Sequence, residues 1–213
     1  MLIDCEQRGS DWLKMRCGSA TGSRIADVMT KRKDGKISAT RESYKRELVI
    51  ERLTENTADH FVNSFMEWGE STEPLALAAY EIETGVEPKQ IGLATHPTIK
   101  YFSASPDALL GEDGVLEAKC LKSENHLDIL LSGEIPADYH WQMYAEMACA
   151  ERKWCDFVSF DPRLPRNLQL FIRRFYWDTA KIAEMELEVV KFLAETDEMI
   201  TSLKQAKMVE IGA

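Results

Sequence analysis

The chain has 213 residues, 45% of them hydrophobic, and a formal net charge of -10 at pH 7. Its length is sufficient for one substantial core and its composition does not shift along the chain, so we expect a single domain over residues 1–213. No apolar run approaches the roughly 20 residues of a membrane-spanning helix and no secretory leader is recognisable, so we expect a cytoplasmic protein without membrane contact.

The first quarter of the chain has helical patterns. Short helices are predicted over residues 10–16 and 21–29, with a polar loop over 31–38 after them. A longer helix is predicted over 40–54. Its apolar side is expected to consist of Tyr44, Leu48 and either Ile50 or Leu53.

Another helix is predicted over residues 73–84, because apolar residues recur there at helical spacing. Pro74 is tolerated in a first turn, where the missing N–H group has no intrahelical partner, and Gly85 is a typical stop signal. The expected buried face of this helix consists of Leu75, Ala78, Ala79 and Ile82.

The middle of the chain changes to the two-residue period of strands. Strands are predicted over residues 90–95, 100–105 and 115–120. Turn signals separate them, at His96-Pro97 and over the glycine-flanked residues 111–114.

Helical and extended patterns then alternate to the end of the chain. A helix is predicted over residues 137–150, strands over 154–160 and around 168–172, and a long amphipathic helix over 178–206. The inner side of this last helix is expected to consist of Ile182, Met185, Val189, Leu193, Ile200 and Leu203. Together these elements predict the α/β class, with a mixed central sheet flanked by helices.

The positive charge of the chain is concentrated near its start. Between Lys14 and Arg52 there are eleven Lys or Arg and five Asp or Glu, so this segment carries about +6 and the remainder about -16. A basic patch can bind phosphates while an acidic exterior repels nucleic acid elsewhere. The alternative is that the cations over residues 31–36 belong to a solvated loop without function.

Two carboxylates and an amine carry the clearest chemical signal in the sequence. Pro106 and Asp107 are followed, after a turn with two glycines, by Glu117 and Lys119. If the two segments form a hairpin, Asp107 and Glu117 lie side by side across the turn. Lys119 then points to the same face as Glu117, because side chains on a strand repeat with a period of two.

Close carboxylates repel each other, and a bound cation relieves that repulsion. Two carboxylates, with the backbone carbonyl that Ala118 can offer, are oxygen ligands that suit Mg²⁺. Lys119 could then hold or deprotonate the water that attacks a phosphodiester, which predicts a metal-dependent phosphodiesterase. The alternative interpretation is a turn beside an exposed pair of strand residues, because short motifs of this kind also occur by chance.

Four sequence blocks lie in a fixed order between about residues 11 and 163. They are Trp12-Leu-Lys-Met-Arg16-x-Gly18-x-x-Thr21-x-Ser23, Trp68-Gly69-x-x-x-Glu73, Ser105-Pro106-Asp107 to Lys119, and Tyr139-x-x-Gln142 leading to Phe160-Asp161-Pro162-Arg163. Together they resemble the family of bacteriophage lambda exonuclease and the YqaJ-type viral recombinases, within the PD-(D/E)XK nuclease superfamily. The resemblance implies one restriction-endonuclease-like domain.

The resemblance also implies roles for individual residues. Glu73 would join the metal site, and the amide of Gln142 would bind a water or the scissile phosphate. The implied metal-binding groups are Asp107, Glu117, the Ala118 carbonyl and Glu73, and the implied catalytic residues are Glu73, Asp107, Glu117, Lys119 and Gln142. Taken alone, Glu73 would be interpreted as a solvated residue at a helix start and Gln142 as a surface amide.

A phosphate-binding pocket is implied by the first and third blocks. Arg16 and Ser23 would bind the terminal 5′-phosphate of a DNA end, with Ser105 as a third contact. A guanidinium gives a planar two-point match to phosphate, and hydroxyl groups add neutral donors. Without the family, Arg16 would be interpreted as an ordinary surface cation.

The resemblance implies a 5′-to-3′ exonuclease that degrades one strand of linear duplex DNA to mononucleotides and leaves a 3′ overhang for recombination. Two Mg²⁺ ions would serve each active site, with Mn²⁺ as a possible substitute. The family further implies a homotrimer, DNA ends and a single-strand annealing protein as partners, and a location in the bacterial cytoplasm as a host or prophage product.

Two other functions remain open at this point. One is a different PD-(D/E)XK nuclease, such as a restriction endonuclease or junction resolvase, which would cut DNA without a free end. The other is a DNA-binding assembly protein without activity, although such a protein has no need of Asp107, Glu117 and Lys119 together.

Five cysteines without a C-x-x-C pair argue against a disulfide framework and against a structural zinc or iron–sulfur site. We expect them to be reduced thiols. Cys120 follows Lys119 in sequence, but adjacent residues on a strand point to opposite faces, so a catalytic role for this thiol is not indicated.

Overall fold

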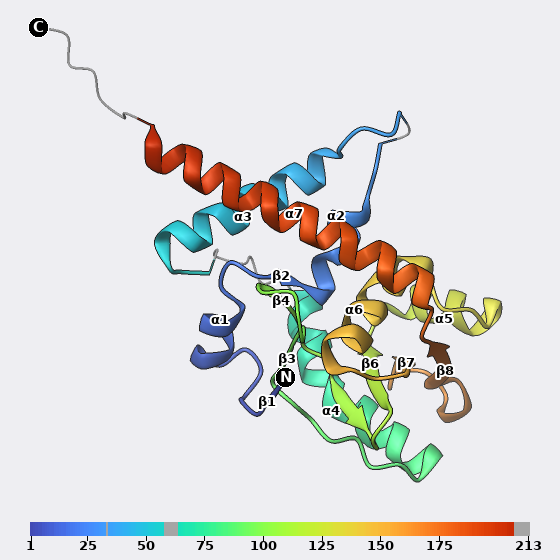
Figure 1. Ribbon diagram of the computed structural model, residues 1–213. Coiled ribbons are helices and arrows are strands. Elements are labelled where there is room, and N and C mark those ends of the chain that lie inside the picture. Colours follow the sequence, from blue (N-terminus) through green and yellow to red (C-terminus); the bar gives the residue numbers. More distant parts are fainter. Residues whose placement is uncertain (33, 58–63, 207–213) are drawn as a thin grey trace, which may run out of the picture.

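The computed structural model describes residues 1–32, 34–57 and 64–206 (Figure 1). Lys33, in the predicted basic loop, and residues 58–63 and 207–213, at the middle and end of the predicted domain, lie outside this description. The side chains of residues 64–66 also lie outside it.

The strands form two four-stranded sheets. The first sheet contains, in spatial order, β1 (Leu2–Ile3), β3 (Leu93–Thr95), β4 (Phe102–Ala104) and β2 (Ala20–Thr21). β3 is antiparallel to both β1 and β4, whereas β2 is parallel to β4. The second contains, in spatial order, β5 (Ala108–Leu110), β6 (Gly114–Lys119), β7 (Trp154–Phe160) and β8 (Leu170–Tyr176).

In the second sheet β6 and β7 are parallel, and the two outer pairs are antiparallel. Both sheets are therefore mixed, and helices flank them (Figure 1). The predicted α/β class with mixed sheets between helices is confirmed, with the strands divided between two hydrogen-bonded sheets.

A three-residue link joins the two sheets. β4 ends at Ala104 and β5 begins at Ala108, so residues 105–107 pass from one sheet to the next. The side chain of Gln7 fixes this link, because its Nε2 donates to the carbonyl of Pro106 at 3.1 Å and to that of Ile91 at 2.8 Å.

The β5–β6 hairpin has the turn that the sequence predicts. Leu110 pairs with Gly114, and Gly111 adopts a φ of 56°, a conformation that glycine reaches without strain. Gly114 is required for another reason, since a Cβ atom there would lie 2.2 Å from the ring of Trp154. The pairing brings Asp107 beside the middle of β6, where its N–H group donates to the Leu116 carbonyl at 3.0 Å.

The helices differ in length and in the surfaces that they cover. They are α1 (Ser10–Arg16), α2 (Ile25–Met29), α3 (Ala39–Thr54), α4 (Ser64–Thr84), α5 (Ser123–Ser132), α6 (His140–Ala150) and α7 (Thr179–Gln205), with 3-10 turns η1 (Gly22–Arg24), η2 (Ala137–Tyr139) and η3 (Arg166–Leu168). α6 contacts β3 and β4 of the first sheet and β6 and β7 of the second. In the described part of the chain, no helix is both long and apolar enough to traverse a bilayer.

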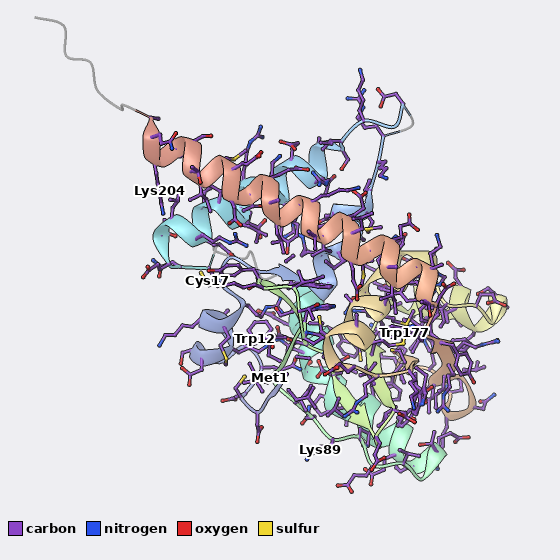
Figure 2. All side chains as sticks on the ribbon, in the orientation of Figure 1. Met1, Trp12, Cys17, Lys89, Trp177 and Lys204 are labelled. Carbon is purple, nitrogen blue, oxygen red and sulfur yellow. The ribbon has the colours of Figure 1, made fainter. Side chains whose placement is uncertain are left out.

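α7 is the longest helix and lies across α2, α3 and α6 (Figure 1). Trp177, just before its start, and Lys204, near its end, mark its two ends in Figure 2. Its buried face includes four of the predicted residues, whereas Leu203 is 44% exposed. The predicted Ile200 is half-buried.

Ion pairs connect α3 to α7 and use three of the cations near the start of the chain. Arg41 binds both carboxylate oxygens of Glu195, at 2.7 and 2.9 Å, and Lys45 binds the same carboxylate at 3.1 Å. Arg52 pairs with Asp197 at 2.7 Å. Three of the eleven cations of the basic segment therefore serve the packing of α3 against α7, and a phosphate-binding patch formed by the others stays a prediction.

α4 differs from its prediction in both length and orientation. It begins at Ser64 rather than at residue 73, so Pro74 lies inside the helix. The buried residues are Ala76, Leu77 and Tyr80, and the predicted inner residues Leu75 and Ile82 are 54% and 80% exposed. The sequence contains two apolar stripes on this helix, and packing against β6, β7 and β8 decides which is buried.

Two other local predictions were wrong, and one helix was missed. The predicted helix over 21–29 is a strand, a 3-10 turn and the five-residue helix α2, because Thr21 pairs with Ser103 of β4. On α3, Ile50 and Leu53 are 56% and 45% exposed. α5 was not predicted.

Candidate active site

The link between the two sheets positions Asp107. Its backbone N–H group is bound to β6, and its Oδ2 accepts a hydrogen bond from the Ala118 N–H group at 2.7 Å. Because two backbone contacts fix the residue, its carboxylate is held over the face of β6 that carries Glu117 and Lys119. The predicted juxtaposition of Asp107 with these residues is present.

Glu117 and Lys119 lie on the same face of β6, as the two-residue period predicts. Glu117 is 3% exposed. The ammonium group of Lys119 contacts Glu117 Oε1 directly. A buried carboxylate is thus paired with a cation of the chain itself, which reduces the energetic penalty of burying its charge.

The helix α6 adds an amide and a third carboxylate. Gln142 Nε2 donates to Glu117 Oε1 at 2.6 Å and to Glu146 Oε1 at 2.9 Å, while its Oε1 accepts from Lys119 Nζ at 3.2 Å. Gln142 and Glu146 share one face of the helix because they are four residues apart. These contacts connect α6 to β6 of the second sheet.

Most of the predicted site residues line one cavity of about 200 Å³. It is lined by Gln7, Arg8, Trp12, Arg16, Ser23, Ser105, Asp107, Glu117, Lys119, Gln142 and Glu146. The acidic residues and the predicted phosphate-binding residues therefore face the same small space, although they come from distant parts of the sequence.

The close packing of carboxylates raises the pKa values of acidic residues in the site. Burial raises the pKa of Asp107 well above its ordinary value, and the charges of Glu117 and Glu73 raise it further. Burial also raises the pKa of Glu146 well above its ordinary value, with Glu117 and Asp107 adding to the effect. One buried oxygen of Glu117, Oε2, and one of Glu146, Oε2, have no hydrogen-bond partner within the described residues.

Lys119 is held in its protonated form. Burial alone would lower the pKa of its ammonium group, but the neighbouring Glu117 and Asp107 carboxylates raise the pKa above the ordinary lysine value. Its side chain is 22% exposed, so one side of the ammonium still faces the cavity. This arrangement suits a group that orients a water or a phosphate oxygen better than one that removes a proton.

The donor set fits a hard divalent cation in its chemistry. It consists of carboxylate oxygens, two of which are buried without partners, and their mutual repulsion is of the kind that a cation relieves. Within the ranges that the structure describes, however, no group of three His, Cys, Asp or Glu side chains has an arrangement that could hold a metal ion as it stands. Lys119 instead occupies the position beside Glu117 Oε1.

Arg16 lines the same cavity as the acids. Its guanidinium stacks on the Trp12 ring, 4.0 Å from the centroid, and its Nη1 donates to Ser105 Oγ at 3.3 Å. Trp12 Nε1 also donates to Ser105 Oγ, at 2.9 Å. Burial lowers the pKa of Arg16 to about 10. Among the ion pairs of the described residues Arg16 has none, so this guanidinium is available to an anion in the cavity.

The other predicted phosphate-binding residues are nearby. Ser105 lies in the link between the sheets, and its hydroxyl accepts hydrogen bonds from both Arg16 and Trp12. Ser23 belongs to η1 and is exposed, with its side chain at the margin of the same cavity.

Glu73 lies outside the 200 Å³ cavity. It lines an adjoining cavity of about 540 Å³, which shares Gln7 and Arg8 with the first. Arg8 Nη2 approaches Glu73 Oε2 at 3.5 Å, and burial raises the Glu73 pKa although Arg8 opposes the shift. Glu117 also raises the Glu73 pKa, so the two carboxylates influence each other across the boundary between the cavities.

Ala118 has a role that the sequence did not indicate. Its N–H group holds Asp107, and its side chain packs against the smaller apolar cluster under the sheet. The predicted use of its carbonyl as a metal ligand is a separate matter and stays a prediction.

No role in the site was predicted for four residues that line the cavity, Gln7, Arg8, Trp12 and Glu146. Glu146 was detectable, because it follows Gln142 by four residues in a predicted helix. Gln7 and Arg8 gave no signal, since their place depends on hydrogen bonds and ion pairs with residues more than 60 positions away.

The cysteines agree with their predicted inert state. All five are free thiols. Burial raises the pKa of Cys120 to about 12, so this thiol beside Lys119 stays protonated and is a poor nucleophile.

Comparison with known proteins identifies similar sequences and structures. The family model of the YqaJ-like viral recombinase domain matches residues 11–153. Uncharacterized protein R354 of Acanthamoeba polyphaga mimivirus is 26% identical over 171 residues, which are 72% of this chain. The match covers only 29% of that viral protein, so its remaining length has no counterpart here.

Solved structures resemble the chain more fully. The alkaline exonuclease LHK-Exo of Laribacter hongkongensis has a TM-score of 0.86 at 44% identity, with 92% of this chain and 97% of that chain covered. Its complex with dAMP has a TM-score of 0.87 over the same shares. A phage-related exonuclease of Haemophilus somnus 129PT has a TM-score of 0.67 at 17% identity, covering 87% of this chain and 96% of that chain, and shares the fold.

Replacing Glu146 with Gln tests whether carboxylate crowding destabilises the metal-free protein. Because the folded-state pKa of Glu146 is raised, its contribution to stability is present below the ordinary carboxyl pKa and is lost as the pH rises through the folded-state pKa. In EDTA, the Tm advantage of Glu146→Gln over the parent should therefore grow from about pH 5 to about pH 9, by roughly 2–4 °C for each kcal/mol of relieved repulsion. Differential scanning calorimetry measures this difference.

The control is Glu83→Gln, at an exposed position of α4. It should leave the pH dependence of Tm unchanged. A Tm difference for Glu146→Gln that is constant with pH would contradict the crowding that the structure indicates.

Proposed function

Because the chain belongs to the family of YqaJ-like viral recombinase domains, we propose that it is a DNA exonuclease that degrades one strand of linear double-stranded DNA from the 5′ end. The products would be 5′-mononucleotides and a duplex with a 3′ overhang, ready for recombination by strand annealing. The observation that carries the proposal is the cavity of about 200 Å³, which both Arg16 and the acidic groups around Lys119 line.

The shared cavity supports cleavage next to a DNA end. A terminal phosphate bound by Arg16 would leave the next phosphate of the strand against Asp107 and Glu117, since little space separates the two sets of groups. Cleavage there would release one nucleotide with its 5′-phosphate. The relative LHK-Exo has been crystallised with dAMP, a mononucleotide of this kind, which supports the same product here.

We propose that Asp107, Glu117 and the Ala118 carbonyl would hold Mg²⁺, with Glu73 at a second or water-mediated position, for two ions in each site. The buried Oε2 of Glu117, which has no hydrogen-bond partner within the described residues, supports this assignment. Bound divalent cations supply charge neutralisation at the phosphate and a lower pKa for water. Mn²⁺ has the same preference for oxygen ligands and could substitute.

The chain's own residues would perform the remaining tasks. The Ala118 N–H group holds one oxygen of Asp107 and so directs the other toward the cavity. Lys119, kept protonated by Glu117, would orient the attacking water or a phosphate oxygen. Gln142 would keep Glu117 and Glu146 at hydrogen-bonding distance from its amide while substrates enter and leave.

Assembly and partners follow from the family. We propose a homotrimer that binds double-stranded DNA ends and passes its 3′ overhang to a single-strand annealing protein. It would act in the cytoplasm of a bacterial host, as a host or prophage product.

Digestion of a linear duplex labelled separately at each terminus tests this function. With Mg²⁺, label at a 5′ end should appear as mononucleotide from the first time points, and label at a 3′ end should remain in long fragments. Without Mg²⁺ no release is expected. Efficient cutting of covalently closed circular duplex would instead support an endonuclease, and failure to cut any duplex would support a DNA-binding protein without activity.

Lys119→Ala should lower the rate of hydrolysis by roughly 1,000-fold, because the ammonium that faces the cavity is lost. Binding to DNA ends should change by less than about threefold, since other groups hold the duplex. Single-turnover digestion and fluorescence anisotropy measure the two quantities. Lys89→Ala, exposed and outside the cavity, is the control, and a Lys119→Ala variant that digests DNA at the parental rate would show that the role is misassigned.

Arg16→Ala should remove the preference for a 5′-phosphate over a 5′-hydroxyl terminus. In the parent, Arg16 has no ion pair within the described structure and would gain one from a terminal phosphate. The ratio of digestion rates on the two duplexes should fall to about one in the variant. An unchanged ratio would exclude Arg16 from the phosphate pocket.

A further inference from the structure

Arg8 occupies a strained turn at the edge of the proposed active site. The turn runs from Glu6 to Gly9 and is closed by the Gly9 N–H group, which donates to the Glu6 carbonyl at 3.1 Å. Arg8 has a φ of 67°, in the left-handed region that residues with a Cβ rarely adopt. Residues in such conformations persist where the surrounding structure fixes them and occur frequently at functional sites.

The surroundings of Arg8 are fixed on both sides. Gln7 is bound to the Pro106 carbonyl in the link between the sheets, one residue from Asp107. The chain then enters α1, which carries Arg16. Arg8 lines both the 200 Å³ cavity, which it shares with Asp107, Glu117 and Arg16, and the neighbouring 540 Å³ cavity.

The ion pairs of Arg8 are of a kind that can be exchanged. Its Nε lies 3.1 Å from Glu70 Oε1 and its Nη2 lies 3.5 Å from Glu73 Oε2. The side chains of Arg8 and Glu70 are 49% and 40% exposed, so their attraction is weakened by water. The Arg8 guanidinium can therefore leave Glu70 for a phosphate at little energetic cost, whereas the less exposed Glu73 loses a partner that favours its charged form.

The charges of the cavity indicate what Arg8 could bind. Its cations are Arg8, Arg16 and Lys119. Lys119 is paired with Glu117 and has one side toward the cavity, and Arg16 is stacked on Trp12. Arg8 is near enough to Arg16 that its positive charge, after the larger effect of burial, lowers the Arg16 pKa. A strand with two adjacent phosphates in this cavity would thus meet two guanidinium groups.

We propose that Arg8 is a second phosphate-binding residue, which exchanges Glu70 and Glu73 for the phosphate between the first and second nucleotides of the degraded strand. The proposal rests on the exonuclease function proposed above. In this arrangement Arg16 binds the terminal phosphate and Arg8 the phosphate that is cleaved. Release of Arg8 also frees Glu73, so substrate binding and the availability of that carboxylate are linked.

Binding to two matched duplexes tests the contact directly. Both are linear and 5′-phosphorylated, and one carries an uncharged methylphosphonate at the first internucleotide linkage of that strand. Affinities are measured by fluorescence anisotropy in EDTA, where a metal-dependent enzyme does not consume the DNA. The parent should bind the ordinary duplex more tightly, and this discrimination should fall by roughly tenfold in Arg8→Ala, because a charge-assisted contact is lost.

Arg8→Gly is the second variant, because glycine adopts a φ of 67° without strain and therefore preserves the turn. It should lose the same discrimination. Glu70→Gln should keep the discrimination or increase it, since Arg8 loses a competing partner. Arg166→Ala, an exposed arginine on η3 outside both cavities, should leave it unchanged.

The outcomes separate this proposal from the function on which it rests. Parental discrimination in both Arg8 variants overturns the contact while leaving the exonuclease assignment intact. A parent protein that binds neither duplex contradicts the proposed function itself. A loss of affinity of equal size for both duplexes in the Arg8 variants would indicate a structural role and would also overturn the contact.

Discussion

The arrangement of the site depends on how two sheets meet. The link over residues 105–107 carries the chain from β4 to β5, and its last residue, Asp107, is tied to β6 by two backbone hydrogen bonds. α6 contacts both sheets and adds Glu146 from the other side. Three carboxylates are thereby forced into a small, largely buried space, and their mutual repulsion is the constraint that the rest of the site must relieve.

The chain relieves part of that repulsion with its own groups. Lys119 pairs with Glu117, and the Gln142 amide donates to both Glu117 and Glu146. Two buried carboxylate oxygens remain without partners, and the pKa values of Asp107 and Glu146 stay raised. A cation that binds between these carboxylates relieves their repulsion and so lowers the free energy of the protein. This is a physical reason to expect metal dependence.

Local patterns in the sequence were sufficient for the hairpin but not for its surroundings. Asp107, Glu117 and Lys119 could be placed together because a turn and a two-residue period determine their geometry. Arg16 could be assigned to the site only by resemblance, since no local pattern separates it from a surface cation. α4 shows the same limit, because two apolar stripes compete on one helix and only packing against the second sheet selects between them. The position of the Arg8 side chain depends on ion pairs to α4, which is distant in sequence, and on a strained turn. Neither feature has a sequence signature.

Calorimetric titration of Mg²⁺ into the metal-free protein tests the central claim most directly, because it measures whether the crowded carboxylates bind a cation. We predict saturable binding in the parent that Asp107→Asn greatly weakens, while the exposed control Glu83→Gln binds like the parent. Absence of saturable binding in the parent, or equal binding by Asp107→Asn, would contradict the claim.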